Sequence, residues 1–294
     1  MGTILLNIYI QEGMRKKSIG AGLLYLTGVF IACTEEVKIG EADPVEIAVT
    51  DTVTRVAGPR REKGSPLSLA RKRIYLTIDD SPLNGSLYID SVIAAEQVKA
   101  NIFLVGKAIE ESRKFGEHFK KLQQNPYIRI YNHSYSHASH RYNEYYRNPV
   151  KVVEDFERNQ LQYHILHKIA RLPGRNLWRL GGRERNCDQA AGQAAKLLAD
   201  EGYHIFGWDL EWRYTAQDYA PEQTIDQLVE QAEKLYTSSH TFTPEHVVLL
   251  VHDQMFAKKN EQNDLGELIR KLKEKDFTFE YLTAYPFSME EGEE

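Results

Sequence analysis

Two adjacent carboxylates, Asp79 and Asp80, stand at the end of the apolar run 74–78 (IYLTI). Two like charges side by side repel, so such a pair usually has a cation to bind. His133 and His137 follow downstream with a spacing of four residues. Imidazole and carboxylate groups are common ligands of divalent metal ions. These residue types together predict a metal-assisted hydrolase.

The spacing of His133 and His137 would place both imidazoles on the same face of one helical turn. One carboxylate of the aspartate pair would complete a set of two histidines and one acid, with positions left open for water and substrate. This set suits Zn²⁺, and also Fe²⁺, Co²⁺ or Ni²⁺. His140 is a rival ligand. The second acid would act as general base towards the metal-bound water.

A separate acid must protonate the leaving group, and His252 is the candidate because it ends a second apolar run. Asp253 or Asp209 would orient it; the alternative is a strand-end histidine satisfied by a hydrogen bond. Arg171 would either pair with the base carboxylate or form a simple salt bridge. Three apolar side chains would either wall a small pocket or pack in the core: Trp208, Trp212 and Leu250.

These residues must be positioned by short apolar runs that alternate with amphipathic stretches. The alternation predicts an α/β fold with a mainly parallel sheet, open or closed as a barrel. Ligands of parallel α/β folds sit at the carboxyl ends of strands, where the candidate residues fall. The predicted strands are 74–78, 102–105, 128–131, 169–172, 204–207, 247–251 and 277–281, and the predicted helices are 87–99, 107–123, 149–167, 187–201, 222–237 and 263–275, with Pro149 and Pro221 at helix starts.

The N-terminal region has the pattern of an export signal. A basic cluster at 15–17 precedes the uncharged stretch 19–31, which is short for a membrane span, and Cys33 follows in the manner of a bacterial lipobox. We expect a lipoprotein anchored to the membrane at Cys33, exported to the bacterial cell envelope or secreted, with Met14 a plausible true start. The alternative is an uncleaved N-terminal anchor.

The bulk composition is that of a soluble globular protein. The chain has 294 residues, 42% hydrophobic, with a net charge of −5, so nothing indicates a nucleic-acid partner. Of its two cysteines, Cys187 reads as a structural residue and not as a nucleophile. The expected organisation is a signal segment (1–33), a linker (34–70), a catalytic domain (71–286) and an acidic tail (287–294).

Five ordered motifs resemble those of the polysaccharide deacetylases of carbohydrate esterase family 4, the NodB homology domain. They are 77–82 (TIDDSP), 133–137 (HSYSH), 171–173 (RLP), 208–212 (WDLEW) and 250–253 (LVHD). The resemblance implies a distorted (β/α)7-type barrel with the active site at the strand C-terminal ends. It also implies metal-dependent removal of N- or O-linked acetyl groups from an oligo- or polysaccharide.

Carried over by position, the resemblance assigns Asp79 as the base and Asp80 as a metal ligand together with His133 and His137. It makes Arg171 the residue that orients the base. His252 is the implied general acid, and the implied substrate pocket and oxyanion residues are Gly174, Trp208, Asp209, Trp212 and Leu250.

The chain also departs from the family pattern. Ser81 replaces a glycine, Ala138 a proline and Gly174 an aromatic residue, while Glu211 stands where an aspartate is expected. Two other functions stay open on this evidence. One is hydrolysis of a non-peptide C–N bond in a small amide, for which the arginine-bearing segment 175–179 would suit an anionic substrate. The other is a non-catalytic, glycan-binding surface lipoprotein.

Overall fold

The computed structural model describes residues 72–186, 191–238, 240–258 and 263–287. Cys33, Cys187, the expected signal segment and the expected linker lie outside these ranges, so their assignments stay predictions. Within the described ranges, no helix has the length and apolar character needed to cross a membrane.

The strands form one ten-stranded sheet. Their order is β6-β5-β7-β4-β3-β2-β1-β9-β8, and β10 pairs with β1 off this path. All pairs are parallel except those of β5 with β6 and with β7. The bounds are β1 (Lys72–Ser81), β2 (Ala100–Leu104), β3 (Ile128–Asn132), β4 (Ile169–Ala170), β5 (Leu177–Leu180), β6 (Arg183–Asn186), β7 (His204–Ile205), β8 (Leu210–Glu211), β9 (His246–His252) and β10 (Phe277–Phe279).

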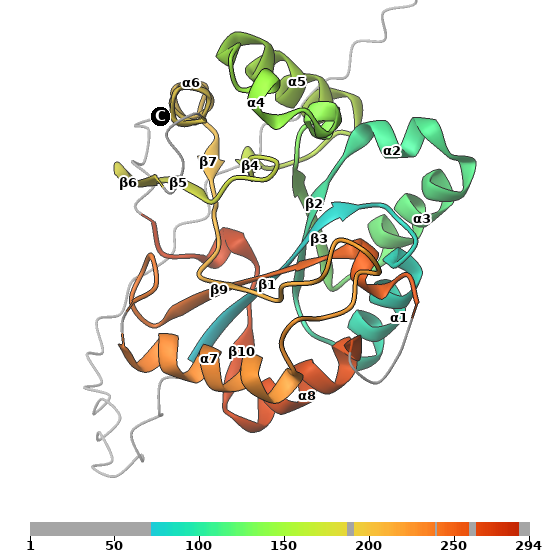
Figure 1. The fold of residues 1–294 in the computed structure, drawn as a ribbon, viewed down its shortest axis with the longest axis vertical. Helices are drawn as coiled ribbons and strands as arrows, with labels where there is room; N and C mark the ends of the chain where they lie inside the picture. Colours follow the sequence, from blue (N-terminus) through green and yellow to red (C-terminus); the bar gives the residue numbers. More distant parts are fainter. Residues whose placement is uncertain (1–71, 187–190, 239, 259–262, 288–294) are drawn as a thin grey trace, which may run out of the picture. The chain divides into compact units, whose positions relative to one another are not determined.

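Helices cover the outside of the curled sheet (Figure 1). Neighbouring helices pack against one another, with α1 touching both α3 and α8, and α7 touching α8. The bounds are α1 (Ser86–Glu96), α2 (Gly106–Glu111), α3 (Arg113–Gln124), α4 (Tyr142–Tyr145), α5 (Pro149–Gln162), α6 (Gly192–Asp200), α7 (Ile225–Ser238) and α8 (Leu265–Glu274), with 3-10 turns η1 (His137–His140), η2 (Asp253–Phe256) and η4 (Leu282–Ala284).

The central strand β1 separates two hydrophobic clusters. Ile74, Leu76 and Ile78 pack on the side of α1, α7 and α8. Tyr75 packs on the opposite face in an aromatic cluster that includes Trp178. Because side chains alternate along a strand, Thr77 and Asp79 share the face of Tyr75. The inner face of the sheet therefore changes from aromatic to polar towards the carboxyl end of β1.

The predicted mainly parallel α/β fold is confirmed, with several local differences. The stretch predicted as one helix over 107–123 divides into α2 and α3 at Ser112, whose φ of −147° is extended. Pro149 begins α5 as predicted, with Asn148 accepting a capping hydrogen bond from Lys151 N. Pro221 does not begin a helix: α7 starts at Ile225, and Pro221 forms a β-bridge with Tyr214.

The hairpin of β5 and β6 was not predicted. Strand β6 has the sequence RERN, with no apolar residue, so hydrophobic patterning offers no signal for it. It pairs with β5 along its whole length, from Leu177 opposite Asn186 to Leu180 opposite Arg183. Charged side chains on such an edge strand discourage pairing with further strands.

Candidate active site

A bulge at the end of β1 separates the two adjacent carboxylates. The register between β1 and β2 shifts between Ile78 and Ser81, and Asp80 has a left-handed φ of 68°. In a regular strand, consecutive side chains point to opposite faces, whereas a bulge re-aims one of them. The bulge allows Asp79 and Asp80 to serve the same site in different directions.

Asp79 is fixed by a buried arginine. Arg171 Nη1 lies 2.8 Å from Asp79 Oδ1 and donates at 2.8 Å to Thr77 Oγ1. Its Nε and Nη2 atoms donate to the carbonyls of Phe206 and Gly207. Burial lowers the pKa of Arg171, and the charge of Asp79 opposes that shift. The guanidinium therefore holds one carboxylate oxygen of Asp79 in place and leaves Oδ2 directed elsewhere.

Asp80, His133 and His137 form a trio in which one ligand atom from each residue lies within 4.8 Å of the others. His137 Nε2 is 3.0 Å from Asp80 Oδ1, and His133 Nε2 is 3.5 Å from the same atom. His133 Nε2 is also 3.5 Å from Asp79 Oδ2. His140, the rival ligand, is exposed and is not part of this trio.

The donor chemistry of the trio fits a divalent metal ion. His133 Nδ1 is 2.9 Å from the carbonyl oxygen of Arg171, so Nδ1 must carry the hydrogen. In the neutral ring, Nε2 then presents its lone pair to a carboxylate, which is favourable only with a cation between them. Burial opposes ionisation of Asp80, but when the two rings are protonated their hydrogen bonds and positive charge outweigh burial and hold the pKa of Asp80 well below its usual value. A divalent cation would supply that positive charge to neutral rings.

The two histidines do not lie on a helical turn as predicted. His133 follows β3 directly, Ser134 has a φ of 65°, and His137 begins η1 with a φ of 49°. Ala138 continues in the left-handed region with a φ of 54°. Proline cannot adopt a positive φ, so the proline of the family pattern would not fit the backbone at this position.

Polar side chains of α5 and β3 support this irregular segment. Asp155 Oδ2 accepts hydrogen bonds from Ser136 N at 3.1 Å, from Ser136 Oγ at 3.0 Å and from Tyr145 Oη at 2.9 Å. Asn132 Oδ1 accepts from Ser134 N and from Asn159 Nδ2, both at 2.9 Å. The backbone between the two histidines is therefore fixed by residues that touch no ligand atom of the trio.

Asp253 fixes the backbone that follows the aspartate pair. It is fully buried, and its carboxylate accepts from Ser81 Oγ at 2.8 Å, Ser86 Oγ at 2.5 Å, Leu83 N at 3.2 Å and Gly85 N at 2.8 Å. All four donors belong to the segment that follows Asp80. Ser81, which replaces the family's glycine, therefore contributes a buried hydrogen bond.

His252 lies opposite Asp79 in the register of β9 with β1. Its ring meets that of Tyr214 edge-on, with 5.0 Å between the ring centroids. Among the described residues, its buried Nδ1 has no hydrogen-bond partner. The expectation that Asp253 or Asp209 orients His252 is wrong, because both carboxylates are bonded elsewhere.

The predicted pocket residues are only partly brought together. Leu250 shares the inner face of β9 with His252, and Trp208 lies 5.7 Å from the Arg171 guanidinium. Trp212 is instead fully buried in the core on the helix side. Asp209 accepts hydrogen bonds from Phe242 N at 2.7 Å and Val248 N at 3.0 Å, away from the trio.

Gly174 and Tyr142 meet beside the trio. Gly174 has a φ of 65°, and a Cβ added to it would lie 3.2 Å from the Tyr142 ring. That ring packs edge-on against His137 at 5.7 Å. A side chain at position 174 would therefore crowd the Tyr142 ring and require a positive φ, so glycine suits this position.

Sequence reasoning missed Thr77, Tyr142 and Tyr214 as neighbours of the site. Burial and then the charge of Asp80 raise the pKa of Tyr142 and of Tyr214 to about 12, so both are neutral phenols at physiological pH. Thr77 begins the first motif, and this position could have indicated that it lies near the site. The spacing of the two tyrosines gave no such signal, because Tyr142 begins α4 and Tyr214 follows β8, far apart in the sequence.

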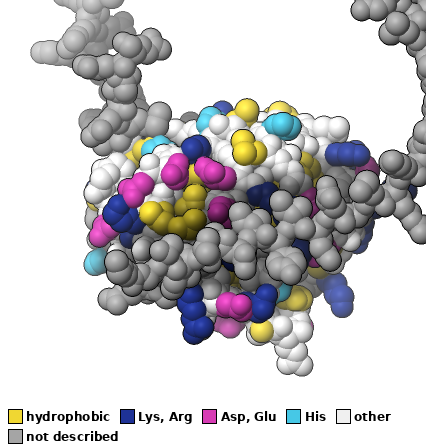
Figure 2. Space-filling model, turned by 90° about the horizontal axis from the view of Figure 1, so that it is seen from above, with side chains coloured by type: hydrophobic (Ala, Val, Ile, Leu, Met, Phe, Trp, Pro, Cys, Tyr) yellow, Lys and Arg dark blue, Asp and Glu magenta, His cyan; other side chains and the backbone are white. Residues whose placement is uncertain are grey.

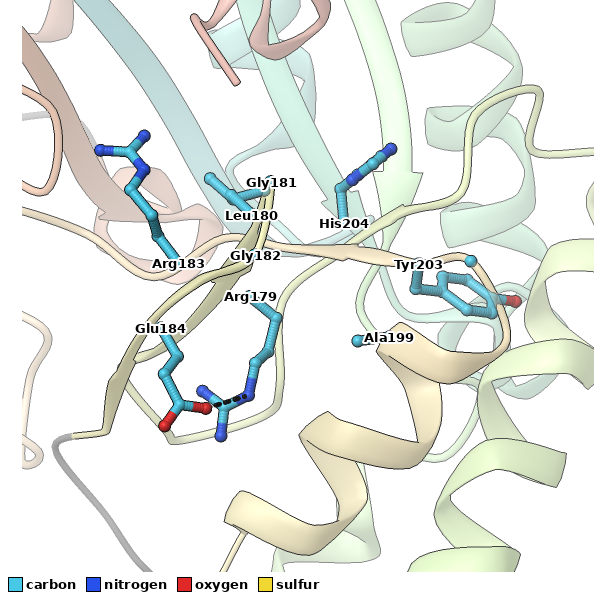
Figure 3. Close-up of a pocket in the computed structure, with 10 residues that line it drawn as sticks. Arg179, Leu180, Gly181, Gly182, Arg183, Glu184, Ala199, Tyr203 and His204 are labelled. Atoms are coloured by element: carbon cyan, nitrogen blue, oxygen red, sulfur yellow. Dashed lines mark ion pairs between the residues drawn. The ribbon is translucent and has the colours of Figure 1, made fainter. Parts of the chain in front are cut away.

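Two pockets differ in their chemistry. One, of about 370 Å³, is lined by residues that include Asp80, His137, His140 and Gln254. The other, of about 610 Å³, lies at the β5–β6 hairpin, where Arg179 pairs with Glu184 at 3.3 Å (Figure 3). The first pocket is the candidate active site, because Asp80 and His137, two members of the candidate metal-binding trio, line it. The face coloured in Figure 2 mixes acidic, basic and hydrophobic side chains.

Comparisons with known proteins test the predicted family. The family model described as polysaccharide deacetylase matches residues 68–249. The chitin disaccharide deacetylase of Vibrio alginolyticus is 25% identical; the match covers 47% of each chain, so this chain spans about half the length of that relative.

Two solved structures share the fold. A Streptococcus mutans CE4 esterase is 22% identical with a TM-score of 0.53, covering 72% of this chain and 86% of the other. The catalytic domain of a peptidoglycan N-acetylglucosamine deacetylase from Eubacterium rectale is 22% identical with a TM-score of 0.52, covering 79% and 99%. The predicted family is confirmed: the chain belongs to the polysaccharide deacetylase family.

Proposed function

We propose that this protein is a metal-dependent deacetylase that removes N- or O-linked acetyl groups from a glycan of the cell envelope or its surroundings. The observation that carries the proposal is that the two adjacent aspartates have different partners. Asp80 faces His133 and His137, whereas Asp79 is held by Arg171. A site that only bound a cation would have no need to set one carboxylate apart.

Asp80, His133 and His137 would hold the ion, with Zn²⁺ the first choice for two histidines and one carboxylate. A divalent ion bound there would polarise an acetyl carbonyl and lower the pKa of water. Asp79 keeps Oδ2 free of Arg171, which suits it to accept a proton from the attacking water.

His252 would return a proton to the leaving nitrogen or oxygen. It pairs with Asp79 in the register of β9 with β1, so the two side chains lie on the same face of the sheet. Tyr214 packs against its ring and limits its rotation. The backbone N–H of Gly174, exposed beside Tyr142, would support the developing oxyanion.

The test is acetate release from acetylated chito-oligosaccharides, peptidoglycan fragments and acetylated xylan. We expect release that is lost on chelation and restored by Zn²⁺. Asp79→Asn should lower the rate by roughly 10²- to 10⁴-fold, since it removes the general base but keeps the shape. Asp276→Asn, an exposed residue after α8, is the matched control. Unchanged release by Asp79→Asn would refute this mechanism, and glycan binding without turnover would favour the non-catalytic alternative.

We also propose export and lipid attachment at Cys33. The support is the sequence pattern alone, a basic cluster, an apolar stretch and a cysteine. Expression of the full chain in a bacterial host with a radiolabelled fatty acid should label the membrane fraction. Cys33→Ser should abolish the label, and persistent labelling would point to another site.

A further inference from the structure

A cationic pocket adjoins the candidate active site. It has a volume of about 440 Å³, and its lining includes Arg141, Arg147, Arg175 and a single carboxylate, Glu144. Glu144 pairs with Arg141 at 3.2 Å. The lining of this arginine pocket is therefore positive in a protein whose net charge is −5. Such a local reversal of sign favours anions.

The arginine pocket is joined to the metal trio by two side chains. His140 lines both this pocket and the one that contains Asp80 and His137. Tyr142 lines the arginine pocket and packs against the His137 ring at 5.7 Å. A glycan with its acetyl group at the trio would therefore place a neighbouring sugar beside the arginines.

Arg175 is held in a defined orientation. Its Nη1 donates to the Gly174 carbonyl at 2.9 Å, and its Nη2 donates to Asn143 Oδ1 at 3.1 Å. Its guanidinium lies 5.2 Å from the Tyr146 ring and 5.7 Å from the Tyr142 ring. A cation that is already ordered loses less conformational entropy on binding than a free surface arginine.

The other arginine of the segment 175–179 lines a different pocket. Arg179 lies on β5 and lines the hairpin pocket, where it pairs with Glu184 and donates to Asn186 Oδ1 (Figure 3). Two arginines that are alike in the sequence are therefore divided by the tertiary structure. Of the two, Arg175 is the one that reaches the site.

We infer that the arginine pocket binds an anionic substituent, a carboxylate or a phosphate, on the sugar next to the one that loses its acetyl group. Guanidinium groups recognise both anions through paired hydrogen bonds. The inference rests on the proposed deacetylase function and narrows it: the substrate is an acidic acetylated glycan.

The experiment compares three acetylated trisaccharides of equal length: a neutral one, one with a uronate beside the acetylated sugar, and one with a phosphate there. KM for acetate release and Kd by calorimetry on the metal-free protein are both measured. Two partly exposed charge pairs predict a roughly tenfold advantage for an acidic ligand, which shrinks at high salt. The double variant R147Q/R175Q should lose this advantage of the acidic ligand, whereas Arg183→Gln in the hairpin should keep it.

The two readouts separate the outcomes. If no trisaccharide releases acetate but the acidic ones bind about tenfold more tightly, the pocket stands and the deacetylase proposal fails. If the neutral trisaccharide is deacetylated and bound as well as the acidic ones, the pocket proposal fails alone. An advantage that survives in R147Q/R175Q with an unchanged melting temperature also overturns it. The uronate and phosphate arms identify the preferred anion.

Discussion

Asp253 and Asp209 are both buried carboxylates surrounded by hydrogen-bond donors, but they lie at different positions along the strands of the sheet. Asp253 accepts four hydrogen bonds from the segment after Asp80, at the carboxyl end of β1. Asp209 accepts from Phe242 N, Val248 N and Arg185 Nη2. Val248 pairs with Tyr75, four residues before Asp79, which is about 13 Å along the strand.

The comparison shows that two buried, hydrogen-bonded carboxylates can have different roles, one linking strands and the other fixing a loop at the candidate site. Burial raises the pKa of both carboxyls, and the hydrogen bonds oppose that shift in each. Asp209 links strands β6 and β9 through Arg185 and Val248, near the two ends of the curled sheet. Asp253 instead fixes a loop whose first neighbour is a metal-ligand candidate.

The largest expected effect is on Zn²⁺ affinity, and it contrasts a histidine at the carboxyl end of the sheet with one at its amino end. His133→Ala should lower Zn²⁺ affinity by more than about 100-fold, since it removes one of three ligands. His246→Ala, which removes the partner of Tyr75 Oη at the opposite end of β9, should leave Zn²⁺ affinity unchanged. Competition with a chromophoric chelator measures both. Equal affinity of His133→Ala and the native protein would remove the trio from consideration.

The next effect tests Asp253 itself. Asp253→Asn must place an amide N–H₂ against backbone or hydroxyl donors, which loosens the segment after Asp80. We expect Zn²⁺ affinity to fall by roughly 10- to 100-fold, as for other residues that orient metal ligands. Asp264→Ala, which removes the cap of α8, controls for simple destabilisation. An Asp253→Asn protein with native metal affinity would contradict the positioning role.

Asp209→Asn should affect stability alone. Unpaired donors at Phe242, Val248 and Arg185 would cost about 1–3 kcal/mol in the free energy of unfolding. Urea denaturation measures the change, and a double-mutant cycle with Arg185→Gln gives the share of the ion pair. A loss of Zn²⁺ affinity equal to that of Asp253→Asn would erase the difference between the two carboxylates.

The smallest effect concerns the left-handed turn at the site. Ala138→Gly relieves a positive φ and should raise the free energy of unfolding by about 0.5–1 kcal/mol. Ala138→Pro should prevent the turn and with it the approach of His137 to Asp80. Thermal melting of the metal-free proteins tests the first, and chelator competition tests the second. A stable Ala138→Pro protein with native Zn²⁺ affinity would contradict this backbone conformation.

Much of the fold could be predicted because the apolar runs are local signals. The run 74–78 gave β1, and the predicted strands at 128–131 and 247–251 match β3 and β9 closely. The β5–β6 hairpin could not be predicted, because the pairing of RERN depends on Leu177–Leu180 and not on its own pattern. The helical turn expected for His133 and His137 failed because spacing alone does not report a positive φ.

The sequence by itself determined which residues gather at the carboxyl ends of the strands, because strand ends follow from apolar runs that can be read locally. Composition and spacing left open which aspartate faces the histidines, and only the family resemblance assigned the two roles. The tertiary structure turns Asp80 towards His133 and His137 through the bulge, and pairs Asp79 with Arg171, which is 92 residues away in the chain. The roles depend on direction in space, and long-range contacts set that direction.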